Sequence, residues 1–337
     1  MKFRKLASLC LSVLCLLSLA ACGGSPTQGG ASSDDGVLRL AYVVTVRDEY
    51  LGLLEDEVIA AAAKHNVAME IFHAGEDSIK SRDCVEAAAN HGNDAVLINM
   101  VASEDAASCI EAAGDMKVVF INRAPADYAL LNQNVALVAS DERLSGAYQG
   151  QFLGDYFNGI GKKDVSYLLL HGTGGLVHTE LRTQGVLDEM QKAGLNLTEA
   201  AILEADYNRY AARDAMAEFL NGENVPQFDC IISNNDAMAL GAIMAMKDAG
   251  LDPTAIPIVG IDATTDALQA ISDGEMIMSV HQSAEMQADG GVMAAVNMLT
   301  GKSIIDQTDY ELSDESDYIV YVPFEPVTKD NLSDFMG

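Results

Sequence analysis

Asp229-Cys-Ile-Ile-Ser-Asn-Asn-Asp-Ala-Met-Ala-Leu-Gly-Ala-Ile-Met-Ala-Met-Lys-Asp-Ala-Gly250 is the stretch of sequence that decides the fold. Residues 229–233 form a short apolar run typical of a buried strand, and three polar residues follow it. Residues 237–249 then carry apolar side chains at helical spacing, and Gly250 is a typical helix end. The stretch therefore predicts one strand–turn–helix unit.

The same unit recurs along most of the chain, in two successive sets. The repetition predicts an α/β protein with two doubly wound parallel-sheet lobes, because buried parallel strands are joined by helices. Strands are expected at 37–46, 67–72, 95–99, 117–122 and 135–138, and again at 165–170, 201–205, 229–233, 256–262 and 277–280. Helices are expected at 50–65, 79–91, 180–193, 210–220, 237–249 and 265–272.

Six amide or carboxylate side chains lie at or just beyond the ends of these strands. Ligands of open parallel sheets bind outside the carboxyl ends of the strands. For any one residue, capping of the following helix is an equal alternative. All six together favour a polar cleft between the lobes. They are Asp48, Asn99, Asn122, Asn235, Asp262 and Gln282.

The first 22 residues have the pattern of a bacterial lipoprotein signal peptide. Lys2, Arg4 and Lys5 precede an apolar run, and Leu19-Ala20-Ala21-Cys22 resembles a lipobox. The alternative, a transmembrane anchor, is disfavoured because the apolar run 6–21 is short for a span of about 20 residues. We expect lipid attachment at Cys22, an extracytoplasmic location and a flexible tether at 23–36, and no contact with the membrane beyond the lipid.

The charge of the chain excludes several classes of partner. The formal net charge is −30, and the first 22 residues hold three basic and no acidic side chains, so the mature chain would carry −33. Such a surface repels nucleic acid and anionic lipid. Cys84, Cys109 and Cys230 remain in the mature chain, and the pattern favours buried small hydrophobes over a disulfide plus one free thiol.

Several collinear segments resemble the type I periplasmic binding proteins that serve as sugar receptors of ABC transporters, above all the galactose/glucose-binding members. They are Ile232-Ser-Asn-Asn-Asp-Ala-Met-Ala-Leu-Gly241, Val118-Val-Phe-Ile-Asn-Arg-Ala-Pro125 and Ile256-Pro-Ile-Val-Gly-Ile-Asp262. The resemblance implies a monomer that closes around one monosaccharide. Its lobes would be 37–140 plus 283–320 and 141–282 plus 321–337, with a hinge near Ser140, Gln282 and Tyr321.

The resemblance also implies roles for individual residues. Asp48 would accept from ring hydroxyls and Tyr50 would stack on the sugar, with Tyr207 as the second stacking aromatic. Arg182 would clamp ring oxygens, while Arg123 and Gln282 resemble the ribose-binding members. The full expected set for the ligand is Asp48, Tyr50, Asn99, Asn122, Arg123, His178, Arg182, Tyr207, Asn235, Asp262 and Gln282.

Two departures from the galactose/glucose pattern stand out. Leu176 and His178 replace a His and an Asp, so a pentose or a deoxy sugar becomes a candidate beside galactose and glucose. The segment 158–164 is too short and too basic for the calcium loop of those members. We therefore expect no metal and no cofactor.

Four functions compete at this stage. The first is delivery of a monosaccharide to the permease of an ABC importer. The second is a sensing subunit that presents ligand to a chemoreceptor or membrane kinase. A repressor effector domain is disfavoured because no helix-turn-helix precedes residue 37. A glycosidase would use Asp48 and Asp262 as its two carboxylates, but the surrounding amides and arginines suit binding, so we expect no enzyme activity.

Overall fold

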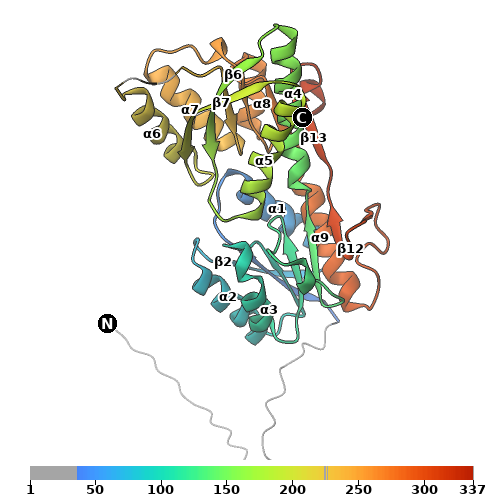
Figure 1. Cartoon of the computed structure of the whole chain (residues 1–337). Coiled ribbons are helices and arrows are strands. Elements are labelled where there is room, and N and C mark those ends of the chain that lie inside the picture. The colour runs from blue at the N-terminus through green and yellow to red at the C-terminus, as the bar shows by residue number, and fades with distance from the viewer. Residues whose placement is uncertain (1–35, 224, 226, 337) are drawn as a thin grey trace, which may run out of the picture. The chain divides into compact units, whose positions relative to one another are not determined.

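Two parallel sheets, each covered by helices on both faces, make up the described part of the chain (Figure 1). The computed structural model describes residues 36–223, 225 and 227–336, which belong to one compact unit. The expected signal peptide, Cys22 and nearly all of the expected tether lie outside the described residues.

The first sheet has seven strands in the order β11-β12-β5-β4-β3-β1-β2. Only the pair β11 and β12 is antiparallel. The strands are β1 (Arg39–Val44), β2 (Ala68–His73), β3 (Ala95–Ile98), β4 (Lys117–Ile121), β5 (Val135–Ala139), β11 (Leu312–Ser313) and β12 (Ser316–Tyr321).

Helices pack on both faces of this sheet because its strands are apolar on both sides. One face is covered by α1 (Glu49–Lys64) and α9 (Ala284–Leu299), the other by α2 (Ser78–Asn90) and α3 (Ala106–Ala113). The short helices η1 (Ser103–Asp105) and η2 (Tyr128–Leu130) lie in connections. We call this sheet and these helices the first lobe.

The second sheet has six strands in the order β13-β10-β9-β8-β6-β7, and only β13 is antiparallel to its neighbour. Its strands are β6 (Asp164–His171), β7 (Asn196–Glu204), β8 (Cys230–Ser233), β9 (Ile258–Val259), β10 (Met278–Gln282) and β13 (Phe324–Thr328). Its helices are α4 (Glu142–Gly159), α5 (Val177–Lys192), α6 (Arg209–Leu220), α7 (Asp236–Asp248), α8 (Thr265–Asp273), η3 (Pro253–Ala255) and η4 (Leu332–Asp334). We call these elements the second lobe.

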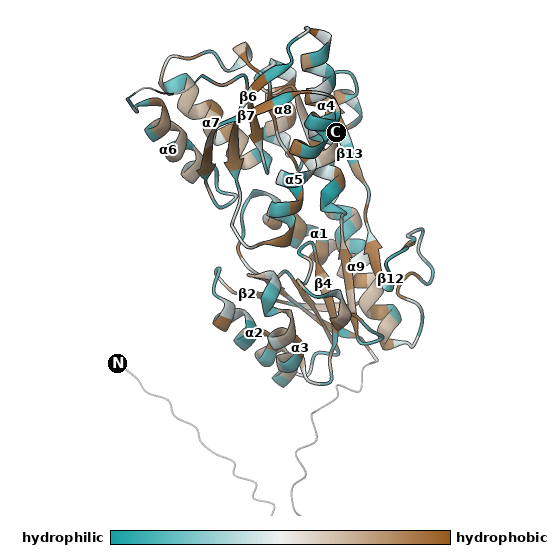
Figure 2. Cartoon of the chain, viewed as in Figure 1, coloured by the Kyte–Doolittle hydropathy of each residue, from teal (hydrophilic) through white to brown (hydrophobic). Residues whose placement is uncertain are grey.

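The chain passes between the two lobes three times. The passages follow β5, β10 and β12, and the expected hinge residues Ser140, Gln282 and Tyr321 stand at these points. Apolar residues line the interior of each lobe, as the brown strands in Figure 2 show. The α/β fold class with two doubly wound lobes is therefore confirmed.

Three elements differ from their expected bounds by three residues or more at one end. Helix α5 begins at Val177 rather than at residue 180, so His178 lies in its first turn. Strand β7 begins at Asn196 because it pairs with β6 along the whole length of that strand. Strand β9 has two residues only, since the chain leaves the extended conformation at Asp262, where φ is 115°.

The three cysteines of the described chain are free. Cys109 and Cys230 are buried in α3 and β8, and Cys84 in α2 is partly buried. Burial raises the pKa of Cys109 to about 11, which keeps its thiol protonated at neutral pH. Within the described residues, no helix is long and apolar enough to cross a membrane.

Candidate ligand-binding site

A polar pocket lies at the carboxyl ends of strands from both lobes. The space in and immediately in front of this open pocket is about 330 Å³, part of which is bulk solvent. Ten of the eleven expected ligand residues line it, and Leu51 is the one further residue in its wall. The pocket is lined by Asp48, Tyr50, Leu51, Asn122, Arg123, His178, Arg182, Tyr207, Asn235, Asp262 and Gln282.

Asp48 and Tyr50 reach the pocket from the start of α1. Asp48 is the N-cap residue, and one carboxylate oxygen accepts from the backbone N–H of Leu51 at 2.7 Å. The Tyr50 backbone N–H also interacts with this carboxylate. Burial raises the pKa of Asp48, while the Leu51 N–H and the charge of Arg123 oppose that rise. Tyr50 is buried, and its hydroxyl has no partner.

Asn99 does not line the pocket, unlike the other residues of the strand-end row. Asn99 is fully buried next to a residue of the pocket wall. Its Oδ1 accepts from the Thr45 hydroxyl at 2.7 Å, and its Nδ2 donates to Asn122 Oδ1 at 3.2 Å. This bond orients Asn122, whose amide nitrogen is left for the pocket. Asn99 is therefore better described as a positioning residue.

Arg123 brings a buried guanidinium that no carboxylate neutralises directly. It donates to the carbonyl oxygen of Met100 at 2.8 Å, and no described carboxylate lies within ion-pair distance. Burial lowers the pKa of Arg123, although the charge of Asp48 opposes this effect. The unused donors of Arg123 suit the oxygens of a polyhydroxyl ligand.

Arg182 is held by protein groups on three sides, which the sequence did not indicate. Its Nε and Nη2 donate to the two oxygens of Glu142 at 2.7 and 3.0 Å, and its Nη1 donates to the Asn234 carbonyl at 2.7 Å. Asp262 Oδ1 lies 4.0 Å from Nη1. Arg182 therefore has less capacity to clamp a ligand than expected, and Glu142 fixes its orientation.

His178 and Tyr207 form one aromatic unit in the second lobe. Their ring centroids are 5.2 Å apart and their planes differ by 28°, so the rings stack. The Tyr207 hydroxyl is bonded to Thr179 at 2.6 Å, and Arg182 lies 5.9 Å from the ring centroid. His178 therefore covers part of the surface that we expected Tyr207 to offer. The stacking role of either ring remains a prediction.

The protonation state of His178 follows from its surroundings. Burial, and after it the charges of Arg123 and Arg182, lower the pKa of His178 well below 6.5. The imidazole is therefore neutral at pH 7, and its Nδ1 has no partner. A neutral imidazole can accept or donate one hydrogen bond to a ligand.

Asp262 is a buried carboxyl of the second lobe on a backbone with a φ of 115°. Burial raises its pKa well above 3.8; the charge of Arg182 opposes this effect, and the charges of Asp236, Asp48 and Glu142 add to it. Asp236 stands behind it, accepts from Ser279 and from the Thr264 backbone, and has a pKa raised to about 7 by burial. A ligand hydroxyl that donates a hydrogen bond to Asp262 would lower the free-energy cost of burying this carboxyl.

Asn235 and Gln282 complete the pocket. Asn235 caps α7 through Oδ1, as the capping alternative predicted, and its Nδ2 donates to the Tyr207 carbonyl oxygen at 3.5 Å, so both amide atoms have protein partners. Both amide atoms of Gln282 are buried without a partner. Three pocket residues have left-handed backbones at or after strand ends: Asn122, Tyr207 and Asp262 have φ of 67°, 60° and 115°.

The pocket brings together hydrogen-bond donors and acceptors from both lobes. Among its described residues, the Tyr50 hydroxyl, His178 Nδ1 and both Gln282 amide atoms are buried and unpartnered. Buried polar groups normally find partners, so these four atoms indicate where a ligand binds. Nowhere in the described part of the chain are three or more His, Cys, Asp or Glu side chains arranged to hold a metal ion.

Comparison with known proteins decides the family. Residues 41–303 match the family model of the periplasmic binding protein domain. The chain belongs to this family. A putative rhizopine-binding protein of Rhizobium meliloti is 31% identical over 276 residues, which cover 80% of this chain and 83% of that protein. The D-galactose/methyl-galactoside binding periplasmic protein of Haemophilus influenzae is 30% identical over 300 residues, which cover 86% and 88%.

Solved structures share the fold of this periplasmic binding protein. An ABC transporter solute binding protein of Bacillus halodurans with bound myo-inositol has a TM-score of 0.76 at 24% identity, over 90% of this chain and 99% of that one. A galactofuranose binding protein has a TM-score of 0.75 at 22% identity, over 88% and 94%. The relatives are binding proteins, which agrees with the expectation that this chain is not an enzyme.

Proposed function

We propose that this protein is a lipid-anchored, extracytoplasmic receptor that captures one monosaccharide, or a cyclic polyol of similar size, and delivers it to an ABC importer. The observation that carries the proposal is the pocket with its unpartnered donors and acceptors contributed by both lobes. Binding would require no metal and no cofactor.

The composition of the pocket supports a neutral, highly hydroxylated ligand. Asp48 and Asp262 accept, Arg123 donates, and Gln282 and Tyr50 do both. A ring hydroxyl also does both, so each hydroxyl can bridge an acceptor and a donor. Relatives named for galactose, ribose and xylitol support the size class of the ligand.

His178 supports a ligand that differs from galactose or glucose at one ring position. At position 178 a neutral imidazole replaces the carboxylate of the galactose/glucose pattern. At position 176 a buried leucine, which cannot form a side-chain hydrogen bond, replaces the histidine of that pattern. An imidazole makes one hydrogen bond to the ligand, where a carboxylate accepts two or more. We infer that a pentose, a deoxy sugar or an inositol binds more tightly than glucose.

A thermal-shift screen of the protein tests this function. The panel contains D-galactose, D-glucose, D-ribose, L-arabinose, L-fucose, xylitol and myo-inositol. A ligand at 100 times its dissociation constant stabilises the folded protein by about 2.7 kcal/mol, which is a shift of several degrees. Titration calorimetry then ranks the ligands that shift the transition.

The outcome of the screen is informative in each direction. A shift with a pentose, a deoxy sugar or myo-inositol supports both the function and the inference from His178. A stronger shift with glucose or galactose retains the receptor function but contradicts that inference. The absence of a shift across the whole panel contradicts capture of a monosaccharide.

A further inference from the structure

Two ion pairs connect the lobes among the described residues. Arg143 of α4 donates to Glu315, between β11 and β12, at 2.9 Å. Arg209 at the start of α6 donates to Glu49 at the start of α1 at 2.6 Å. Neither pair was indicated by the sequence, because its members are 172 and 160 residues apart.

The two pairs differ in their position relative to the passages between the lobes. Arg143 follows Ser140 closely and Glu315 shortly precedes Tyr321, so this pair lies beside two of the three passages. A rotation of one lobe about the passages would therefore change the distance between Arg143 and Glu315 little. Glu49 stands between the pocket residues Asp48 and Tyr50, and Arg209 follows Tyr207 by two residues. A ligand enters only if these two edges of the pocket separate, and then Glu49 leaves Arg209.

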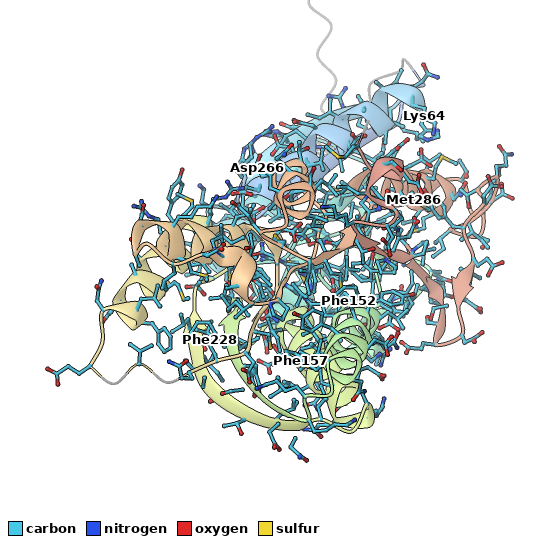
Figure 3. The ribbon with its side chains drawn as sticks, turned by 90° about the horizontal axis from the view of Figure 1, so that it is seen from above. Lys64, Phe152, Phe157, Phe228, Asp266 and Met286 are labelled. Carbon is cyan, nitrogen blue, oxygen red and sulfur yellow. The ribbon has the colours of Figure 1, made fainter. Side chains whose placement is uncertain are left out.

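Groups of the second lobe already hold the Arg209 side chain in place for its contact with Glu49. The same Nη2 atom lies 2.8 Å from Asp266 of α8, and the neighbouring Asn208 caps α6. In Figure 3, which is seen from above, the helix that carries Asp266 overlaps in projection with α1, the blue helix that ends at Lys64. The guanidinium is largely shielded, with 20% of its side chain exposed. Because Asp266 already restrains Arg209, little side-chain entropy is lost when Glu49 arrives.

We propose that Arg209 is a closure latch: its bond to Glu49 forms when the lobes close and slows the release of the bound ligand. The proposal rests on the proposed function, since it assigns a positioning role at that same pocket. The latch increases the fraction of closed molecules, and the apparent affinity for a ligand rises with that fraction. It also makes release depend on ionic strength, because the pair is partly exposed.

A double-mutant cycle tests the latch on the purified protein. The variants are Glu49→Gln, Arg209→Gln and the two combined, and the probes are D-galactose, D-ribose and myo-inositol. For each probe that binds, we expect either single variant to raise the dissociation rate about two- to fivefold. The double variant should be no faster than the faster single one, because both changes break the same bond.

Two control variants separate the latch from a general loss of charge. Glu315→Gln breaks the pair beside the passages but keeps an acceptor oxygen for the hydroxyl of the expected hinge residue Tyr321, so it should leave the dissociation rate unchanged. Asp266→Asn removes the partner within the second lobe and should have a smaller effect than Glu49→Gln. Raising the salt concentration should accelerate release from the wild type but hardly from Glu49→Gln. Additive effects of the two single variants, or equal effects of Glu315→Gln and Glu49→Gln, would contradict the latch.

The latch can also be tested without any ligand. X-ray scattering at low salt should give a larger radius of gyration for Glu49→Gln than for the wild type, and high salt should remove the difference. Equal radii at low salt, together with unchanged release rates, overturn the proposal. If none of the probes binds but the radii differ as expected, the latch stands and the proposed ligand class fails.

Discussion

Single residues of the pocket are arranged for a ligand at the expense of stability. Asp262 is buried near three other carboxylates, its own oxygens have no hydrogen-bond donor among the described residues, and its nearest cation is shared with Glu142. Replacement by Asn removes the like-charge repulsion without leaving Arg182 unpaired. We expect Asp262→Asn to raise the free energy of unfolding by about 0.5–2 kcal/mol and to weaken ligand binding about tenfold or more. Chemical denaturation and calorimetry measure the two effects.

The pH dependence of this variant has a definite sign. Burial raises the pKa of Asp262 in the folded protein, so the fold retains a proton that the unfolded chain loses above about pH 4. The wild type therefore loses stability relative to Asp262→Asn as the pH rises from about 4. The difference should be smallest at the acid end and largest near neutral pH. The control is Asp155→Asn, an exposed position of α4, for which the difference in free energy of unfolding from the wild type should not change in this way with pH. A difference between Asp262→Asn and the wild type that does not change with pH would contradict the argument.

At the scale of elements, the contact between α4 and α5 depends on glycine. A Cβ atom on Gly146 would lie 2.2 Å from the carbonyl oxygen of Arg182, so the two helices approach backbone to backbone. We expect Gly146→Ala to destabilise the fold by about 1–3 kcal/mol and to impair binding, because α5 carries His178 and Arg182. Gly159→Ala, near the end of α4 with open space around it, is the matched control. Its expected effect is neutral or slightly stabilising, and similar losses in both variants would contradict the packing argument.

The sequence predicted the elements better than the contacts between them. Alternation of apolar runs and helical patterns predicted the two sheets, and polar residues at strand ends predicted five residues that line the pocket. The resemblance to periplasmic sugar-binding proteins implied five more. The sequence could not predict that Asn99 does not line the pocket, because this depends on its hydrogen bonds to Thr45 and Asn122, which come from other strand ends. Nor could it predict the pairing of Arg182 with Glu142, 40 residues apart, since such contacts depend on how two helices pack.

At the scale of the whole molecule, charge and anchoring are linked. A chain that begins at Cys22 would carry a formal charge of −33 and be repelled by anionic lipid, so it would stay at the membrane only through a covalent anchor. We expect Cys22→Ser to move the protein from the membrane fraction to the soluble fraction, with ligand binding unchanged. Fractionation with and without high salt measures this. A protein that stays at the membrane after the substitution would contradict lipid attachment at Cys22.

The left-handed backbones at Asn122, Tyr207 and Asp262 determine how this receptor could acquire a new ligand. Such φ values exclude β-branched residues and favour Asn, Asp and Gly, so these three positions tolerate few alternatives. Tyr50 and His178 stand on ordinary helical backbone, which sets no such restriction on the side chain. Evolution or directed selection would therefore alter the choice of ligand mainly through positions 50 and 178, while the left-handed positions stay fixed as a common framework.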